Sequence, residues 1–288
     1  MPPSDLPPYG STPPPLPLRP HDGHKGIFGR ILLLGGCADM IGAPALAGLA
    51  ALRCGSGLVR VAAPRAVLPA ILTLAPEMTG LGLGAATQLK PLLDAAENAD
   101  ALIVGPGLGQ SPAAKTRVLR LIRLPKPMVV DADALNIISL QKNWPAFFQA
   151  HAVLTPHPGE MKRLARFLGR TDVPADQEGR IGLAIAAAKA FGQVIVLKGH
   201  RTVVSDGTRL YVNTTGDSTL SKAGSGDVLS GILGCLLGQK MPPFDAACLA
   251  AHLHGKAGEI AGQRCGTRCA LARDVIDAIS PSIAQHGG

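Results

Sequence analysis

The sequence has few aromatic residues, which make up 3% of 288 residues and include one Trp and two Tyr. Proteins that bind single-stranded nucleic acid usually stack bases on several aromatic rings, so this class is disfavoured. The formal net charge is +8, but the Lys and Arg residues stand singly and form no run of five or six. We therefore expect no nucleic-acid partner, and the positive balance suits a small anionic ligand.

Long apolar segments are also absent. No run reaches the roughly 18 residues of a membrane span, and no basic stretch followed by an apolar one opens the chain. The six cysteines are widely spread in a chain too large to need disulfide staples. These features predict a cytoplasmic protein with reduced thiols and no membrane partner. The closest pair, Cys265 and Cys269, lacks further ligands at zinc-finger spacing, so the sequence assigns no metal ligands.

Proline, in contrast, is abundant at the start of the chain, where it occupies nine of the first 20 positions. Such a segment cannot form a helix or a central strand. We predict a flexible, extended arm over residues 1–20. No internal repeat and no Gly/Ser linker divides the rest, so residues 21–288 are predicted to be a single domain.

From residue 30 onward, short apolar runs alternate with longer alanine-rich stretches. Uniformly apolar runs are typical of strands buried on both faces of a parallel sheet. Strands are predicted at 31–34, 58–62, 101–104, 128–131, 152–155 and 194–198. Helices are predicted between them, at 43–54, 66–72, 86–97, 112–123, 134–140, 159–168 and 178–191. This alternation predicts βαβ units in a three-layer α/β/α sandwich with a mostly parallel central sheet.

The pattern changes after residue 198. An Asp206-Gly207 turn between two short apolar runs, 203–205 and 209–213, predicts a β-hairpin in the C-terminal half. Two long apolar helices are expected next, at 226–238 and 244–262, followed by a short one at 272–279.

The segment Gly224-Ser225-Gly226-Asp227 opens the first of these apolar helices. Glycines at a helix start expose backbone N–H groups to an anion, and the helix dipole adds to their effect. We interpret the segment as a phosphate pocket. Asp227 in the first turn could be a dipole-complementing residue, but beside a phosphate it could also take a proton from a hydroxyl group. The catalytic interpretation is favoured.

Polar and glycine-rich turns follow several predicted strands, at the end where open α/β sheets bind ligands. Two prolines hold His157 after one strand, and Glu160 begins the next helix, where it could cap that helix or orient hydrated Mg²⁺. The other turns are Gly105-Pro-Gly107-Leu-Gly109, Asp131-Ala-Asp133-Ala-Leu-Asn136 and Lys198-Gly199-His200-Arg201-Thr202. Their recurrence at four strand ends predicts one shared site.

In their order, these segments resemble the ADP/ATP-dependent NAD(P)H-hydrate dehydratases, a branch of the ribokinase-like superfamily. The similarity covers roughly residues 20–280 and begins at His24-Lys25-Gly26. It continues through the three turns above, through Pro156-His157-Pro158-Gly159-Glu160, and through Gly224-Ser225-Gly226-Asp227-Val228-Leu229. The resemblance implies a ribokinase-like fold. It also implies a hydro-lyase that repairs the hydrated nicotinamide cofactor, and in this family Asp227 would be the catalytic base.

The resemblance also assigns binding residues. The hydrate would contact Ala43, Gly107, His157 and Asp227. The adenine nucleotide, ADP or ATP, would contact Lys198, Gly199, His200, Arg201, Thr202 and Gly226. Mg²⁺ would neutralise the phosphates, as in phosphoryl transfer generally. A phosphoryl group would pass to the hydroxyl of the (S)-epimer of NADH or NADPH hydrate, and elimination of phosphate would restore the reduced cofactor. A separate epimerase is the expected partner, and a homo-oligomer is the expected assembly.

The chain departs from the family pattern at two loops. Residues 37–41, Cys-Ala-Asp-Met-Ile, lack the Tyr and Thr expected there, and residues 216–223 replace a Gly-Asn-Pro-Gly-Met pattern. Two alternatives therefore stay open. One is a small-molecule kinase of the same superfamily, of the hydroxymethylpyrimidine or hydroxyethylthiazole type. The other is a nucleotide-binding sensor without catalysis.

Overall fold

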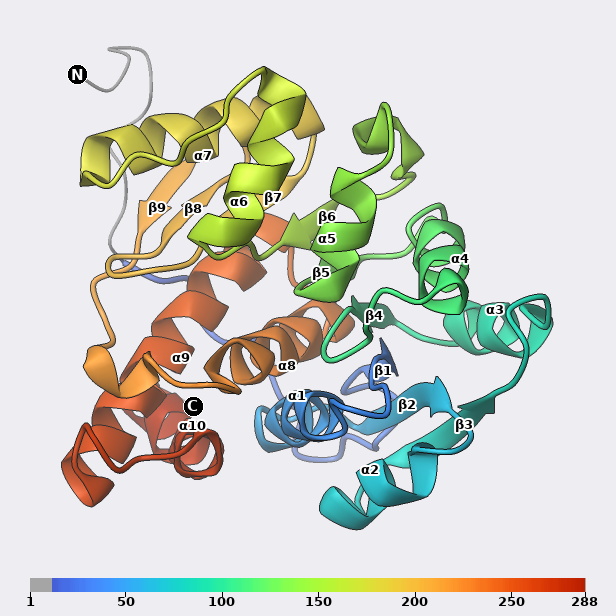
Figure 1. Cartoon of the computed structure of the whole chain (residues 1–288). Coiled ribbons are helices and arrows are strands. Elements are labelled where there is room, and N and C mark those ends of the chain that lie inside the picture. Colours follow the sequence, from blue (N-terminus) through green and yellow to red (C-terminus); the bar gives the residue numbers. More distant parts are fainter. Residues whose placement is uncertain (1–11, 288) are drawn as a thin grey trace.

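A sheet of nine strands runs through the centre of the computed structural model, which describes residues 12–287 (Figure 1). The strands are β1 (Arg30–Leu34), β2 (Leu58–Pro64), β3 (Thr79–Leu83), β4 (Ala101–Val104), β5 (Met128–Val130), β6 (Ala152–Leu154), β7 (Val194–Leu197), β8 (Val203–Ser205) and β9 (Leu210–Val212). Their order in the sheet is β3-β2-β1-β4-β5-β6-β7-β8-β9. The first seven strands are parallel, whereas β8 and β9 form an antiparallel hairpin beside β7.

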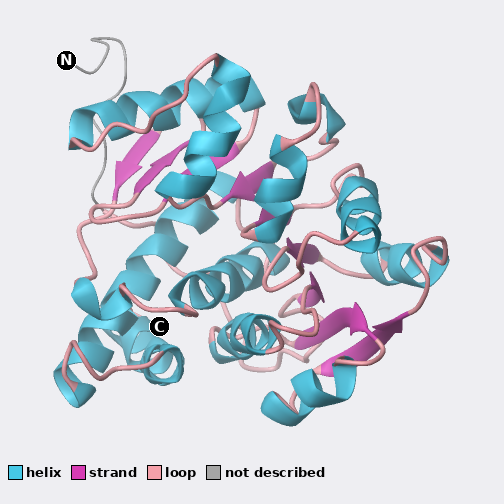
Figure 2. Ribbon diagram, in the orientation of Figure 1, coloured by secondary structure: helices cyan, strands magenta, loops and turns pink. Residues whose placement is uncertain are grey.

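Helices cover both faces of this sheet (Figure 2). They are α1 (Gly42–Arg53), α2 (Leu68–Leu74), α3 (Lys90–Glu97), α4 (Pro112–Leu121), α5 (Asp133–Ser139), α6 (Pro158–Leu164), α7 (Gln177–Phe191), α8 (Ser225–Gly238), α9 (Pro243–Cys265) and α10 (Ala272–Gln285). Short 3₁₀ turns are η1 (Trp144–Phe147), η2 (Ala165–Leu168) and η3 (Ser218–Leu220). One buried cluster joins a sheet face to α1, α2, α8, α9 and α10, and a second joins the other face to α3 through α7. This is the predicted three-layer α/β/α sandwich.

The apolar strands are buried on both faces, as their composition predicts. In β1, Ile31 and Leu33 belong to one cluster while Leu32 and Leu34 belong to the other. Successive side chains of a strand point to opposite faces, so a strand covered on both sides must be apolar throughout.

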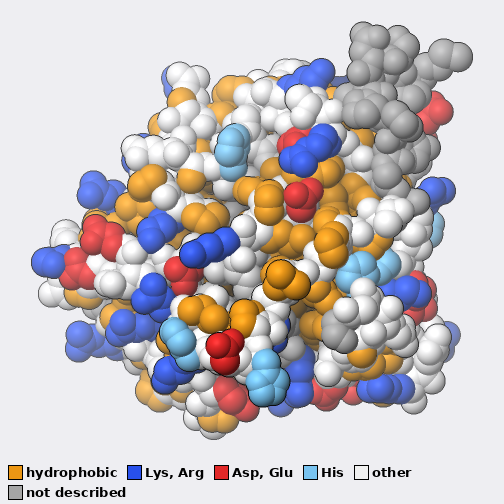
Figure 3. Space-filling view, turned by 180° about the vertical axis from the view of Figure 1, so that it is seen from behind, with side chains coloured by type: hydrophobic (Ala, Val, Ile, Leu, Met, Phe, Trp, Pro, Cys, Tyr) orange, Lys and Arg blue, Asp and Glu red, His pale blue; other side chains and the backbone are white. Residues whose placement is uncertain are grey.

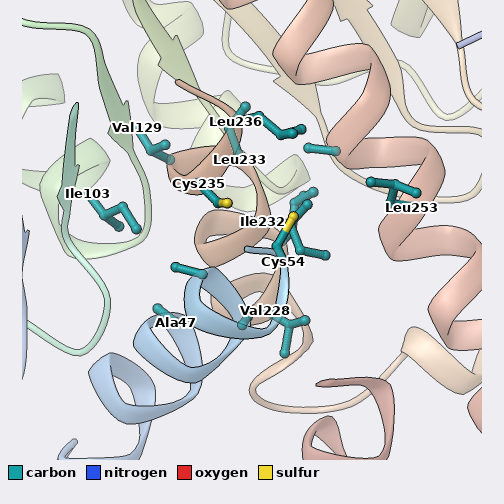
Figure 4. Packing of buried hydrophobic residues seen from close by; sticks show 14 of the residues in the cluster. Ala47, Cys54, Ile103, Val129, Val228, Ile232, Leu233, Cys235, Leu236 and Leu253 are labelled. Carbon is teal, nitrogen blue, oxygen red and sulfur yellow. The ribbon is translucent and has the colours of Figure 1, made fainter. Parts of the chain in front are cut away.

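Small residues allow α8 to lie close against α1 (Figure 4). A side chain at Gly231 would overlap the carbonyl oxygen of Ala47, and its Cβ would come within 2.7 Å of the Cβ of Ala50. Val228 and Ile232 of α8 are fully buried beside this contact. The close packing fixes the position of α8, and with it the position of the glycine-rich segment at its start.

Three details differ from the sequence-based prediction. The edge strand β3, Thr-Gly-Leu-Gly-Leu, was not predicted, since its two glycines weaken the apolar pattern of a strand. The helix predicted over 159–168 divides into α6 and η2. Helix α10 continues past 279 to Gln285 with Pro281 inside it, because packing against the core cluster buries Ile279 and Ser282 in this last part.

The described part of the proline-rich arm, residues 12–20, contains no helix or strand. Leu16 packs against the core cluster, and Nη1 of Arg19 donates to the carbonyl oxygen of Gly55 at 2.9 Å. Nε2 of His286 lies 2.9 Å from the carbonyl oxygen of Pro14. Residues 1–11 lie outside the described part of the chain. The flexibility of the arm and the single domain over 21–288 therefore stay predictions.

The back of the molecule shows separate Lys and Arg side chains interspersed with Asp and Glu (Figure 3). Across residues 12–287, no helix combines the length and the apolar character that crossing a membrane requires.

Candidate active site

The glycine-rich segment forms the N-terminus of α8, as predicted. Gly224 precedes the helix with φ of +87°, and a Cβ there would lie 2.7 Å from Cδ1 of Leu46. This position therefore requires glycine, both for its left-handed backbone and for its close contact with α1. Ser225, Gly226 and Asp227 form the first turn; the N–H of Ser225 donates to the carbonyl oxygen of Lys222 at 3.3 Å, whereas those of Gly226 and Asp227 have no backbone partner in the described part of the chain. The start of α8 is consequently suited to bind an anion.

A cavity of about 670 Å³ opens beside this helix start. Its size falls in the range of small-molecule sites. It lies at the carboxyl ends of β5, β6 and β7, where an open α/β sheet binds its ligand. The predicted site residues among its lining are His157, Lys198, Gly199, His200, Arg201, Thr202, Gly226 and Asp227. The structure thus brings together residues that are up to 70 positions apart in the sequence.

A buried ion pair lies at the base of this cavity. Nζ of Lys198 donates to Oδ1 of Asp131 at 2.8 Å, and the hydroxyl of Ser230 donates to Oδ2 at 2.7 Å. Burial alone would raise the pKa of Asp131, but the charge and hydrogen bond of Lys198 outweigh it and hold that pKa below its usual value. Burial likewise opposes the charge on Lys198, yet Asp131 and Glu160 raise the pKa of its ammonium. Both groups therefore stay charged at neutral pH.

Asp227 is largely buried beside this pair. Burial and the negative charge of Asp131 raise the pKa of Asp227 to about 7, although Lys198 acts in the opposite direction. A carboxylate with this pKa is ionised in about half of the molecules at neutral pH. General-base catalysis is most effective when the pKa of the base is near the working pH. The geometry and the charge state of Asp227 both suit proton transfer.

His157 and Glu160 cap the start of α6. Nδ1 of His157 accepts from the backbone N–H of Gly159 at 2.9 Å, while Oε2 of Glu160 accepts from the backbone N–H of His157 at 2.8 Å. Burial raises the pKa of Glu160, and burial together with Lys198 lowers the pKa of His157. Of the two roles considered for Glu160, helix capping is the one that these contacts show. Nε2 of His157, on a half-exposed ring, is a neutral polar group at the cavity wall.

Ala43 and Gly107 lie close together but are not among the residues that line this cavity. A Cβ at Gly107, whose φ is +59°, would be 3.0 Å from the Cβ of Ala43 and 2.5 Å from the carbonyl oxygen of Met40. Asp133 supports the same loop, because its Oδ2 accepts from the N–H of Gly109 at 2.8 Å. The two small residues keep the 105–109 turn tight against the start of α1.

Some lining residues were assigned no role from the sequence. Asp131 is one of them, although it lies in a strand-end turn that was predicted to belong to the shared site. No sequence signal indicates His254, which lies in the middle of α9. Its Nε2 lies 3.2 Å from the hydroxyl of Ser225, and burial lowers its pKa to about 4, so the ring is neutral at physiological pH. His254 thereby contacts the first turn of α8 from the middle of the next helix, α9.

Comparisons with known proteins show to which family the chain is similar. The profile of the NAD(P)H-hydrate dehydratase family matches residues 31–281. A bifunctional NAD(P)H-hydrate repair enzyme from Moorella thermoacetica is 42% identical over 91% of this chain and 50% of its own length. An ADP-dependent (S)-NAD(P)H-hydrate dehydratase from Neisseria meningitidis is 40% identical over 88% of this chain and 84% of its own. The chain spans about half the length of several curated relatives that it matches.

Solved structures show the same fold. An ADP/ATP-dependent NAD(P)H-hydrate dehydratase from Bacillus subtilis, co-crystallised with ATP and Mg²⁺, superimposes with a TM-score of 0.78. It is 31% identical and the match covers 94% of this chain and 95% of that one. A ribokinase-like protein from Enterococcus faecalis has a TM-score of 0.80 at 24% identity, over 94% and 92% of the two chains. The predicted ribokinase-like fold is confirmed, and the chain belongs to the NAD(P)H-hydrate dehydratase family.

Proposed function

We propose that this protein dehydrates the (S)-epimer of NADH or NADPH hydrate at the expense of ADP or ATP. The observation that carries this proposal is the position of Asp227. Its carboxylate lies at the start of α8, beside backbone N–H groups suited to a phosphate, and its pKa of about 7 suits a base. The 40% identical relative from Neisseria meningitidis is an ADP-dependent (S)-NAD(P)H-hydrate dehydratase, which supports the same reaction.

The reaction divides into two balanced steps. Asp227 takes the proton of the hydroxyl group on the hydrated ring, and the hydroxyl oxygen attacks the terminal phosphorus of the nucleotide. The bond between that phosphorus and the bridging oxygen breaks, so ADP leaves AMP, or ATP leaves ADP. The phosphorylated ring then loses inorganic phosphate and a ring proton, which restores the double bond of NADH or NADPH. The overall change is removal of water coupled to cleavage of one phosphoanhydride bond.

The nucleotide and the hydrate are assigned to two different groups of residues near Asp227. The strand-end loop 198–202 and Gly226 hold the nucleotide, and its negative charge suits the N-terminus of α8. His157, Ala43 and Gly107 contact the hydrate. Of these, His157 lines the same cavity as Asp227, whereas Ala43 and Gly107 would contact a part of the hydrate that extends beyond it. His157 offers a neutral ring nitrogen for hydrogen bonding to a hydroxyl or amide group.

Mg²⁺ would accompany the nucleotide. Within residues 12–287, no three His, Cys, Asp or Glu side chains gather where they could hold a metal ion. A magnesium ion at this site would be bound mainly by phosphate oxygens and water, with at most one or two protein carboxylates. The ion would neutralise phosphate charge during transfer. Glu160, which lines the cavity, would be one such carboxylate, in addition to its contacts with the N–H of His157 and with Lys198.

One base and one phosphoryl donor can serve only one configuration at the carbon that carries the hydroxyl group. The other epimer of the hydrate therefore needs an epimerase, which we propose as the partner activity on a separate chain. A cytoplasmic location and a homo-oligomeric assembly complete the proposal. Fractionation and light scattering test these two points.

The test of the proposed function is recovery of NADH or NADPH from purified hydrate of defined epimer. Protein, Mg²⁺ and either ADP or ATP are added, and absorbance of the reduced nicotinamide ring is followed. We expect absorbance to rise with the (S)-epimer only, and only when nucleotide is present. Formation of a stable phosphorylated alcohol without recovery of the reduced cofactor would instead indicate a kinase. Nucleotide binding with no turnover of any alcohol would indicate a sensor.

A further inference from the structure

A buried arginine lies directly behind the loop that lines the nucleotide side of the cavity. Arg180 projects from the first turn of α7, and only 8% of its surface is exposed. Within residues 12–287, no carboxylate pairs with its guanidinium. Burying a charge is costly unless polar groups compensate it, so the partners of Arg180 are informative.

Most of these partners are backbone carbonyls of one loop. Nη1 of Arg180 donates to the carbonyl oxygen of His200 at 2.6 Å. Nη2 donates to the carbonyl oxygens of Leu197 at 3.3 Å and Lys198 at 3.4 Å. A neighbouring side chain completes the arrangement, because Gln177 accepts from Nη1 at 3.2 Å and donates to the carbonyl oxygen of Arg201 at 3.2 Å. The planar guanidinium therefore fixes the orientation of several successive peptide groups.

Two residues of this loop have a positive φ, which residues other than glycine rarely adopt. Gly199 has φ of +144°, and a Cβ at this position would lie 2.8 Å from Nη2 of Arg180. Arg201 has φ of +52°, which a residue with a side chain rarely adopts. Such a conformation persists only when its surroundings stabilise it. The hydrogen bonds from Arg180 and Gln177 supply that stabilisation.

The carbonyl contacts determine where the opposite ends of the peptide groups point. A peptide group is planar and trans, so the N–H of a residue points away from the carbonyl oxygen of the residue before it. With the carbonyls of Lys198 and His200 directed at Arg180, the N–H groups of Gly199 and Arg201 point away from it. Both residues line the cavity, and neither N–H donates to another backbone group in the described part of the chain.

We propose that Arg180 is the positioning residue of the nucleotide site, which holds the N–H groups of Gly199 and Arg201 as a pair of donors for acceptor atoms of the adenine nucleotide. This inference rests on the proposed function only in naming the ligand. The buried positive charge also polarises the peptide groups so that their N–H ends favour negatively charged or lone-pair atoms. Arg180 itself does not reach the cavity lining and touches no reacting atom.

The chain offers a matched control for the loss of a buried arginine. Arg117 of α4 is 5% exposed, and its Nη2 donates to the carbonyl oxygen of Gly84 at 2.6 Å. Burial lowers the pKa of both guanidinium groups. Arg117 is not among the residues that line the cavity. Removing Arg117 should therefore lower stability as the loss of any buried arginine does, without disturbing the loop that is proposed to bind the nucleotide.

The test compares Arg180→Ala, Arg180→Lys and Arg117→Ala by calorimetric titration with ADP and with ATP in the absence of hydrate. We expect Arg180→Ala to raise the nucleotide Kd about tenfold or more, in line with the loss of charge-assisted hydrogen bonds. Arg180→Lys should keep part of the affinity, because lysine keeps the positive charge but lacks the planar set of N–H donors of the guanidinium. Arg117→Ala lowers the unfolding midpoint and leaves the nucleotide Kd within about twofold of wild type.

A folded Arg180→Ala protein with wild-type nucleotide affinity overturns the proposal. So does an equal loss of affinity in Arg117→Ala. If Arg180→Ala does not fold, Gln177→Ala serves instead, with an expected two- to threefold rise in Kd, and ¹⁵N NMR of the wild type reports directly on the amides of Gly199 and Arg201. Amide signals that do not move when ADP is added contradict the donor role. Because these measurements use no hydrate, a wild-type protein that fails to dehydrate hydrate leaves this inference standing and rejects only the proposed reaction.

Discussion

The ammonium of Lys198 lies 2.8 Å from the carboxylate of Asp131, and this buried pair sets the charge balance around Asp227. The two partners act on Asp227 in opposite directions, since Asp131 raises its pKa and Lys198 lowers it. The structure therefore places Asp227, the proposed base, at the N-terminus of α8 with a pKa that depends on both neighbours. Five predictions rest on this arrangement and on the packing that holds it.

Replacing Asp227 with Asn removes the base and keeps the size of the side chain. We expect kcat to fall about 10²- to 10⁴-fold, the usual contribution of general-base catalysis. Nucleotide affinity is expected to be retained or slightly improved, because a negative charge beside the phosphates is lost. Steady-state kinetics and calorimetric titration measure the two effects. Unchanged turnover in Asp227→Asn excludes Asp227 as the base.

The pH dependence of activity follows from the raised pKa of Asp227. A base must be ionised to accept a proton, so kcat/KM should rise with pH and level off above about 7. Asp131→Asn removes the neighbouring negative charge that raises this pKa, and the midpoint of the rise should move to lower pH. The measurement is a pH–rate profile of both proteins. A midpoint near the ordinary value of an aspartate in the wild type would contradict the assignment.

Stability should depend on pH in the opposite sense. Asp227 has a higher pKa in the folded state than in the unfolded chain, so its contribution to stability is present below about pH 4 and is lost as pH rises through about 7. Asp227→Asn should therefore be more stable than wild type at pH 8, by at most about 4 kcal/mol, and show little gain at pH 4. Urea unfolding at the two pH values measures the difference. An equal gain at both values would point to a cause other than ionisation.

Removing the cation of the buried ion pair should strongly lower the stability of the folded protein. Lys198→Met leaves Asp131 buried without its partner, and we expect the free energy of unfolding to fall by about 3–5 kcal/mol. The matched control is Lys90→Met, because Lys90 makes an exposed ion pair with Asp94 at 2.7 Å, and the loss of an exposed pair should change the free energy of unfolding far less. Chemical denaturation compares the two. Similar losses in both variants would show that burial of the Lys198 pair is unimportant.

The close contact between α1 and α8 predicts that Gly→Ala substitution has opposite effects on stability at two helical glycines. Gly231→Ala places a methyl group against the carbonyl of Ala47, and overpacking of this kind costs about 1–3 kcal/mol. Gly182→Ala, in α7, meets no atom within 4 Å and should stabilise the protein by about 0.5–1 kcal/mol through helix propensity. Thermal unfolding of the two variants should shift in opposite directions. A neutral Gly231→Ala would show that α8 can move away from α1.

Much of the architecture followed from local patterns in the sequence. Uniformly apolar runs predicted the parallel strands, the Asp206-Gly207 turn predicted the hairpin, and the glycines at 224 and 226 predicted where α8 begins. These patterns act over a few neighbouring residues, so they can be interpreted without knowing what lies across the molecule. The order of the motifs also indicated the family.

The tertiary structure decided which of these groups act together. Burial and the proximity of Asp131 raise the pKa of Asp227, although the two residues are far apart in the sequence. His254 reaches Ser225 from the middle of a long helix, and Arg180 reaches the 197–200 loop from the start of another. Desolvation, charge–charge interaction and the direction of a hydrogen bond depend on distances in space. For this reason the sequence singled out Asp227 and the loop 198–202, while only the folded chain showed which groups shift the pKa of Asp227 and which side chain contacts the loop.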